Sequence, residues 1–367
     1  MNHNKEVFMS MRFSRRSVLA GSAATLATTI LPGRIWAADP LKVGFIYIGP
    51  IGDYGWTHGH DIARREIEAK FGDKVKTSYV ESVPEGPDAE RVLRQLAQAG
   101  NELIFTTSFG YMNPTIRVAK TLPKVKFEHA TGYQTAPNVS TYNARFHEGR
   151  AVCGTIAGHM TKTGVTGYIG SVPIPEVVMG INAYTLAARK IRPDMKVKVI
   201  WVNSWYDPGK ESDGAKALID GGADILCQHT DSPAAIQVAE ARGIHAFGQA
   251  SDMRNFAPKA QLTSIVDNWG PYYVERVQAV MDGTWKSSSI WWGFKHGMVT
   301  LAPYNEAMPP EVVAAAEKTK ADIITGTLDP FAGPIKNQKG ELVVPEGKSL
   351  SDEEIAKMDW YVEGVEA

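Results

Sequence analysis

The sequence predicts an α/β protein built of two doubly wound domains in series. Short apolar, β-branched runs alternate with amphipathic stretches of about ten to fifteen residues, a pattern that indicates βαβ units and parallel sheets. The alternation restarts near residue 147, and 367 residues are more than one core of ordinary size needs.

The first 37 residues are predicted to be a secretory signal peptide rather than part of the fold. The pair Arg15–Arg16 precedes an apolar run at 18–31, and the small residues Ala37 and Ala38 follow as cleavage points. This order is typical of a cleaved signal, and the paired arginines favour the twin-arginine type. Cleavage removes five basic residues and one acidic residue, so the net charge falls from −1 to −5. A charge of this sign and size gives no indication of nucleic-acid binding.

The first block predicts strands that are covered on both faces. "LKVGFIYI" (41–48) is almost continuously apolar, as such a strand should be. A helix is expected at 87–100, with Asp88 near its start and Gly100 at its end. The other expected strands are 74–81, 101–108, 124–130 and 139–146, and the other helices are 57–70 and 113–122.

The second block repeats this order and then becomes less regular. Its expected helices are 147–164, 176–191, 208–222 and 232–243, and its expected strands are 165–171, 196–204, 223–230 and 244–250. Beyond residue 260 we expect strands at 260–269 and 295–305, helices at 271–282 and 309–326, a hairpin at 336–344, and a closing helix or lid at 351–365.

Cys153 and Cys227 are the two cysteines of the chain. Neither lies near the cleavage point, so the sequence predicts no lipid anchor. An oxidising compartment would allow them to form a disulfide. We expect two buried free thiols instead, because one falls in a helical pattern and the other in a strand pattern.

The loop after the first strand, "GPIGDYGWTHGH" (49–60), does not fit a phosphate, dinucleotide or metal site. Its glycines lack the G-x-G-x-x-G spacing, Asp53 would repel a phosphate, and Trp56 would block its approach. His58 and His60 are two residues apart and do not share a helix face. We therefore expect neither a cofactor nor a metal, and "HTDSP" (229–233) is interpreted as a helix start rather than a catalytic set.

Aromatic and hydrogen-bonding side chains gather in the loops that follow the predicted strands. Ligands of open α/β sheets bind beyond the carboxyl ends of the strands, so these loops should meet. Aromatic faces with Asp or Asn side chains suit a planar, polar heterocycle. Ordinary packing of scattered aromatic residues is the alternative. The candidate ligand-binding residues are Trp56, Phe109, Tyr111, Asn182, Trp205, Asp231, Asp252 and Trp269.

Three stretches resemble the basic membrane protein (BMP) family of ABC-transporter substrate-binding proteins. They are "GPIGDYGWTHGHDIAR" (49–64), "GYIGSVPIPEVVMGINAYTLAAR" (167–189) and "WVNSWYDPGKESDGAKALIDGGADILCQHTDSPAAIQVAEARG" (201–243). The resemblance implies a type I periplasmic binding protein, with two doubly wound three-layer lobes joined by a hinge of three crossovers. Lobe 1 would comprise 41–145 plus about 268–304, and lobe 2 would comprise 146–267 plus about 305–367.

The resemblance also implies a purine nucleoside or a free base as ligand. Nucleoside-binding relatives often carry an aromatic residue where this chain has Gly180, and a lysine where it has Asp267, Asn268 and Trp269. The missing lysine favours a free base such as adenine, with Trp205 and Trp269 supplying the stacking.

The expected protein is therefore not an enzyme. It would be a monomeric periplasmic carrier without a lipid anchor, which delivers its ligand to an ABC permease of the inner membrane. The alternatives are a sugar-binding protein of the same fold and an exported nucleoside hydrolase with Asp231 or Asp252 as general base.

Overall fold

β1 (Leu41–Tyr47) lies inside the first sheet, and six of its seven residues, all except Lys42, are buried. The computed structural model describes residues 39–367, which form one compact unit. The predicted signal peptide lies outside these described residues.

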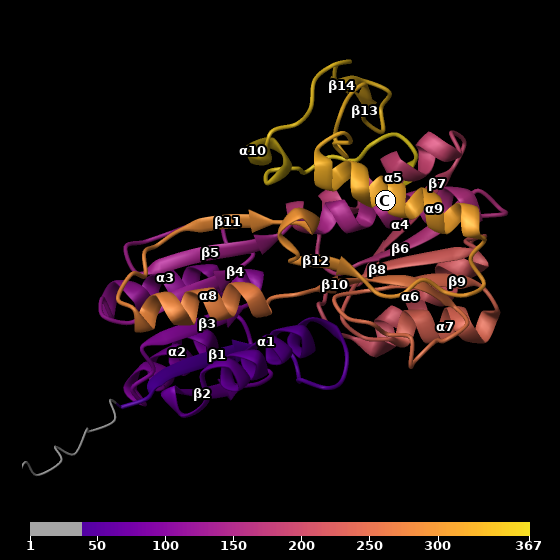
Figure 1. Cartoon of the computed structure of the whole chain (residues 1–367). Coiled ribbons are helices and arrows are strands. Elements are labelled where there is room, and N and C mark those ends of the chain that lie inside the picture. The colour runs from indigo at the N-terminus through magenta and orange to yellow at the C-terminus, as the bar shows by residue number, and fades with distance from the viewer. Residues whose placement is uncertain (1–38) are drawn as a thin grey trace, which may run out of the picture. The chain divides into compact units, whose positions relative to one another are not determined.

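The first sheet has six parallel strands in the order β11-β5-β4-β3-β1-β2. Helices α1 and α8 pack together on one face, and α2 and α3 pack on the other (Figure 1). The further strands are β2 (Val75–Val80), β3 (Leu103–Thr107), β4 (Lys126–Ala130), β5 (Val139–Ala144) and β11 (Ser289–Trp292). The helices are α1 (Gly55–Phe71), α2 (Pro87–Gln98), α3 (Met112–Thr121) and α8 (Gly270–Met281).

The second sheet has seven strands in the order β12-β10-β9-β8-β6-β7-β15, and only β12 runs antiparallel to its neighbour. Its strands are β6 (Val165–Gly170), β7 (Lys196–Trp201), β8 (Ile225–His229), β9 (His245–Gly248), β10 (Gln261–Asp267), β12 (Val299–Leu301) and β15 (Val365–Glu366). Its helices are α4 (Phe146–Met160), α5 (Pro175–Ile191), α6 (Pro208–Asp220), α7 (Ala234–Arg242) and α9 (Pro310–Thr325).

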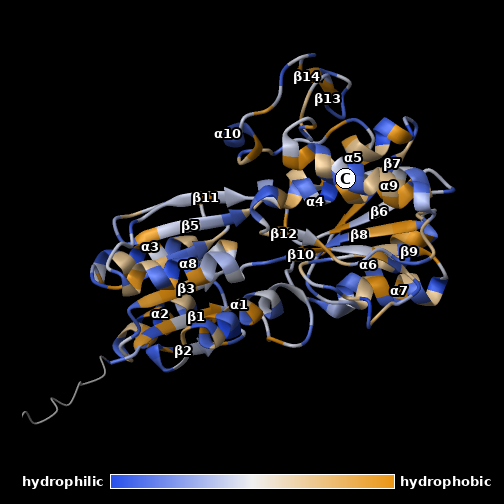
Figure 2. Ribbon diagram, viewed as in Figure 1, coloured by the Kyte–Doolittle hydropathy of each residue, from blue (hydrophilic) through white to orange (hydrophobic). Residues whose placement is uncertain are grey.

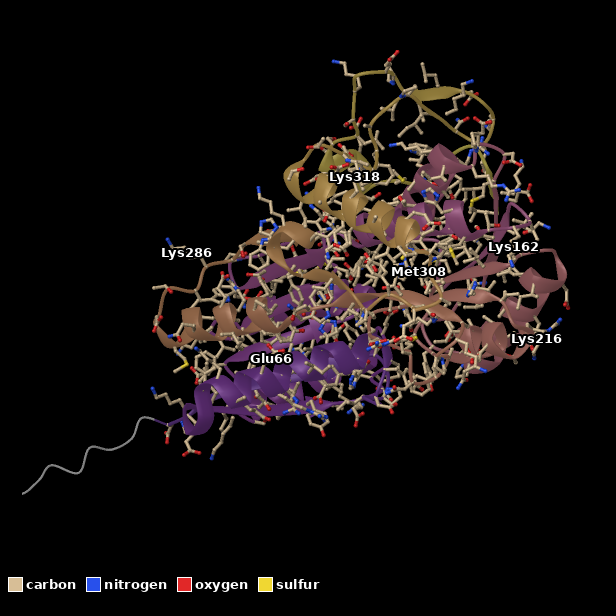
Figure 3. All side chains as sticks on the ribbon, turned by 45° about the vertical axis from the view of Figure 1, so that its right-hand side comes forward. Glu66, Lys162, Lys216, Lys286, Met308 and Lys318 are labelled. Atoms are coloured by element: carbon tan, nitrogen blue, oxygen red, sulfur yellow. The ribbon has the colours of Figure 1, made fainter. Side chains whose placement is uncertain are left out.

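Helices pack on both faces of the second sheet through apolar side chains. α6 and α7 cover one face, while α4 and α5 cover the other and α9 packs on α4. Strands such as β6 and β8 are coloured as hydrophobic along much of their length in Figure 2. Charged side chains lie outside: Lys162, Lys216 and Lys286 project from the periphery in Figure 3, whereas Met308 is buried. Both lobes are therefore three-layer α/β units, as the sequence predicts.

The chain crosses between the two sheets three times, after β5, after β10 and after β11. This matches the three crossovers that the family resemblance implies. β12 pairs with β10 in the second sheet, although the sequence assigned residues up to about 304 to the first lobe. The remaining lobe boundaries stay a prediction.

Three local predictions differ from the structure. β11 was not expected, and it joins the sheet by pairing with β5, far away in sequence. The strand expected at 295–305 shrinks to β12, because the short 3-10 helix η3 (Phe294–His296) and left-handed Gly297 precede it. The closing helix expected at 351–365 ends at Ile355 as α10 (Asp352–Ile355), and the chain then extends to form β15.

The remaining predictions near the C-terminus and at the cysteines agree with the structure. β13 (Ile335–Lys336) and β14 (Leu342–Val344) form the expected antiparallel hairpin. Cys153 and Cys227 are buried free thiols, as expected. Two further 3-10 turns are η1 (Gly72–Lys74) and η2 (Phe109–Tyr111).

Candidate functional site

A cavity of about 40 Å³ lies between the carboxyl ends of the strands of the two sheets. The first lobe contributes Ile48, Trp56, Ser108, Phe109 and Thr131, and the second contributes Glu176, Trp205, His229, Thr230, Asp231 and Gln249. Each of these residues ends a parallel strand or belongs to the loop or first helical turn that follows one. The cavity thus lies where ligands of open α/β sheets bind.

Three aromatic side chains supply the apolar walls of the cavity: Trp56, Phe109 and Trp205. The indole Nε1 of Trp56 donates to the carbonyl of Thr107 at 2.7 Å, so this ring needs no hydrogen-bond partner from a ligand. Phe109 belongs to the short turn η2, directly after β3. The three side chains offer ring surface on which a flat molecule can stack.

Asp231 joins the two lobes at the edge of the cavity. Its Oδ1 accepts a hydrogen bond from the backbone N–H of Trp56, in the first turn of α1. The backbone N–H of Gly55 donates to Ser251 Oγ at 2.6 Å, also across the lobes. Since Tyr54 provides no side-chain cap, α1 receives its N-terminal cap from the second lobe. Burial raises the pKa of the Asp231 carboxyl to about 7.

Glu176 reaches the cavity from the first turn of α5. Its Oε1 lies 3.7 Å from His229 Nε2. Burial raises the pKa of Glu176 to about 8 and lowers the pKa of His229 well below its usual 6.5. Both groups are therefore neutral at pH 7, and their contact is not an ion pair at that pH.

Several buried polar atoms around the cavity have no hydrogen-bond partner among residues 39–367. They are Glu176 Oε2, His229 Nδ1, Thr230 Oγ1 and Thr131 Oγ1. Leaving a buried polar group unpaired costs about 1–3 kcal/mol. The unpaired atoms therefore indicate a polar ligand or water at this place.

Gln249 is held from behind by a buried arginine. Arg150, on α4, is fully buried and donates from Nη2 to Gln249 Oε1 and from Nη1 to Cys227 Sγ at 3.2 Å. Because the Gln249 carbonyl oxygen is used in this way, its amide Nε2 is the group left for a ligand. Arg150 thereby turns an amide donor toward the cavity.

The structure brings four of the eight candidate residues together: Trp56, Phe109, Trp205 and Asp231 line the cavity. Two of the others are held in the interior by their own contacts. The Tyr111 hydroxyl donates to the carbonyl of Val83 at 2.5 Å. Asn182 binds the backbone of Trp360 and Val362, which fastens the C-terminal segment onto α5.

Asp252 and Trp269 do not line the cavity either. Asp252 accepts from Arg254 Nε at 2.8 Å and from Gln261 Nε2 at 2.9 Å. Trp269 is buried, with its ring 4.7 Å from that of His60 and 5.3 Å from that of Trp56. It supports Trp56 from outside the cavity.

Sequence reasoning missed Glu176, Thr131 and Gln249 as cavity residues. Gln249 stands three residues before the candidate Asp252, and Glu176 stands at the start of the helix expected at 176–191. Thr131 follows β4 with a left-handed φ of 57°, which no sequence pattern indicated.

The histidine pair and the rest of the described chain give no metal site. His58 Nδ1 lies 3.1 Å from the carbonyl of Gly52, and His60 Nδ1 lies 2.6 Å from the Tyr273 hydroxyl, so the two rings have different neighbours. Within residues 39–367, no three His, Cys, Asp or Glu side chains are placed to hold a metal ion. The helices of this same part include none that is long and apolar enough to cross a bilayer.

A purine-binding protein of Brucella abortus is 60% identical over 94% of this chain and 98% of its own length. A putative ABC transporter glucose-binding protein of Haloferax volcanii is 35% identical over 89% of this chain and 81% of its own. A solved ABC transporter solute-binding protein of Aeropyrum pernix shares the fold, with a TM-score of 0.67, 19% identity, and 80% and 94% of the two chains covered.

The family model for ABC transporter substrate-binding proteins of the PnrA-like type, named Bmp, matches residues 41–329. The two lobes, the three crossovers and the cavity between strand ends agree with that match. The chain therefore belongs to the Bmp family of ABC transporter substrate-binding proteins.

Proposed function

We propose that this protein captures a purine base or nucleoside between its two lobes, with a free base of the adenine type favoured. The observation that carries the proposal is the cavity itself, in which three aromatic side chains stand beside unpaired hydrogen-bonding groups. Each stacked ring adds about 0.5–1.5 kcal/mol beyond the burial of area. The similarity to a purine-binding relative supports the same ligand class.

The small cavity volume supports a base over a nucleoside. Phe109, Thr131 and Glu176 also line a wider groove of about 600 Å³ that adjoins the cavity. A ribose would have to extend into this groove. Asp267 and Asn268, which stand where nucleoside-binding relatives carry a lysine, do not line the groove. Asp267 is buried with both carboxyl oxygens unpaired among the described residues.

A sugar ligand is the second candidate, and the glucose-binding relative favours it. Aromatic rings with Asp and Gln side chains also bind sugars. The neutral state of Glu176 at pH 7 argues for the heterocycle, because a neutral carboxyl offers a donor and an acceptor instead of two acceptors.

An enzymatic role has less support from the geometry. Asp252, one of the two candidate general bases, lies outside the cavity and is bound by Arg254 and Gln261. Asp231, the other, accepts a hydrogen bond from the N-terminus of α1. Incubation with nucleosides should therefore release no free base, which chromatography of the reaction mixture would check.

As a substrate-binding protein of an ABC transporter, the chain works with a small-molecule ligand and a permease. We extend this to a monomer in the periplasm, exported through a cleaved signal at residues 1–37 without a lipid anchor. Ligand capture would bring the lobes together by a hinge motion at the three crossovers, and the permease would receive the liganded form.

Mass spectrometry of the mature protein, purified without added ligand, tests the proposal. Native spectra give the mass of the complex, and denaturing spectra give the mass of the released molecule. A purine base would support the proposal, and a nucleoside would keep the purine but overturn the preference for a free base. A hexose would overturn the purine, and if the protein is empty, thermal-shift assays with the same three ligand classes decide.

A further inference from the structure

Glu176 is a buried carboxyl that faces the cavity without a cationic partner. The residue is 8% exposed, and its Oε2 has no hydrogen-bond partner among residues 39–367. Its Oε1 lies 3.7 Å from Nε2 of His229, at the end of β8. A carboxyl in this position needs a partner that the described protein does not supply.

The surroundings of Glu176 disfavour its anionic form. β8 presents His229, the loop after β8 presents Asp231, the end of β10 presents Asp267, and α4 presents Arg150. The arginine donates its hydrogen bonds to Gln249 and Cys227 instead of Glu176. Burial raises the pKa of Glu176 to about 8.

A protonated carboxyl presents an O–H donor beside a carbonyl acceptor, whereas a carboxylate presents acceptors only. The neutral acid thus matches a ligand edge on which an N–H group stands beside a bare ring nitrogen. The amidine edge of 6-aminopurine has this arrangement. A carboxylate would match two adjacent donors.

We propose that Glu176 determines ligand specificity by pairing, as a neutral acid, with an amidine edge of a flat nitrogen heterocycle such as 6-aminopurine. This inference rests on the proposed function, since it names the chemistry of the same site. Gln249 completes the recognition: Arg150 holds its carbonyl oxygen, so its amide donates to a second acceptor of the ligand.

Calorimetric titration of 6-aminopurine into three Glu176 variants of the mature protein tests this pairing. Glu176→Gln keeps one donor and one acceptor, and we expect its affinity at pH 7 to stay within about threefold of the unmodified protein. Glu176→Met keeps the length without hydrogen bonds, and we expect a loss of about 10- to 100-fold. Glu353→Gln is the control, because Glu353 lines the adjoining groove and pairs with Lys357.

The outcomes are distinct. If Gln and Met weaken binding equally, Glu176 acts as an anion and the proposal is overturned. If neither variant changes the affinity, Glu176 does not touch the ligand and the proposal is likewise overturned. If the unmodified protein binds no purine at all, the proposed function fails, whatever the variants do.

The pH dependence of binding gives a second test, whose main readout comes from the unmodified protein. Affinity for 6-aminopurine should fall above about pH 8, where Glu176 loses its proton. Glu176→Gln should lose this decline. A flat profile to pH 9 in the unmodified protein would overturn the neutral-acid role.

Discussion

At the scale of single residues, the cavity contains two carboxyl groups that burial makes harder to ionise. Glu176 and Asp231 both have raised pKa values, of about 8 and about 7, and desolvation is the main cause in each. The hydrogen bond from the backbone N–H of Trp56 offsets part of the cost of burying Asp231, while Oε2 of Glu176 receives no such hydrogen bond among the described residues. The protein thus carries unfavourable burial at the place where a ligand would relieve it.

This arrangement predicts the effect of pH on stability without ligand. Between pH 4.5, the ordinary pKa of Glu176, and about 8, the unfolded chain has lost this proton and the folded chain retains it. The free energy of unfolding should therefore fall as the pH rises through this window, by up to about 1.4 kcal/mol per pH unit from this group. Glu176→Gln should flatten the decline, as urea unfolding at a series of pH values would measure.

Phe109 predicts a second effect at this scale. Phe109→Leu keeps an apolar side chain but removes the ring, so purine affinity should drop by about 0.5–1.5 kcal/mol, or roughly 2- to 12-fold. Tyr111→Phe is the matched control in the same turn, because its hydroxyl binds Val83 away from the cavity. It should lower stability slightly and leave affinity unchanged. Equal affinities for Phe109→Leu and the unmodified protein would exclude stacking on this ring.

The sequence was informative about which loops meet and less so about which side chains in them matter. Periodicity placed the strand ends, and strand ends meet in any parallel sheet, so Trp56, Phe109, Trp205 and Asp231 could be predicted. Asn182 could not be assigned, because its partners at 360–362 lie about 180 residues away and no local pattern reveals them. Glu176 looks in the sequence like an ordinary first-turn acid.

At the scale of elements, α1 depends on the second lobe for its N-terminal cap. Gly55 has a φ of 79°, and a Cβ there would lie 2.7 Å from the backbone oxygen of Asp231, besides touching its carboxyl. Glycine at this position lets the two lobes approach each other.

Gly55→Ala should therefore weaken ligand binding, by about tenfold or more, because the contact between α1 and Asp231 can no longer form as it is. Gly72→Ala is the control at the other end of α1: its φ is also positive, at 54°, but a Cβ there would meet nothing within 4 Å. Both variants should lower the free energy of unfolding by about 1 kcal/mol through backbone strain. Only Gly55→Ala should change the affinity. Equal affinities for the two variants would contradict the capping of α1 by the second lobe.

The elements that sequence periodicity missed are those that tertiary contacts define. β11 and β15 each have few residues, and each forms by pairing with a strand far away in sequence, β5 and β7. The stretch at 351–365 has helical composition, but Asn182 binds the backbone after Ile355 in an extended form. In this segment, the long-range hydrogen bonds from Asn182 outweigh the local preference for a helix.

At the scale of the whole molecule, ligand binding should stabilise the contact between the lobes. Three hydrogen bonds among the described residues join the lobes beside the cavity: Gly55 with Ser251, Trp56 with Asp231, and Tyr54 with Tyr206 through their hydroxyls at 3.2 Å. A ligand that touches both lobes adds to them. At a ligand concentration of 100 times Kd, binding raises the free energy of unfolding by about 2.7 kcal/mol.

The most direct test of the purine assignment is a titration of protein freed of any retained ligand by unfolding and refolding. Free bases, nucleosides and sugars would be added separately in a calorimeter, with thermal shift as a parallel readout. The account predicts that 6-aminopurine binds in a one-to-one complex and raises the melting temperature, more strongly than its nucleoside, while glucose and ribose do neither. Binding of a sugar with no response to any purine would contradict it.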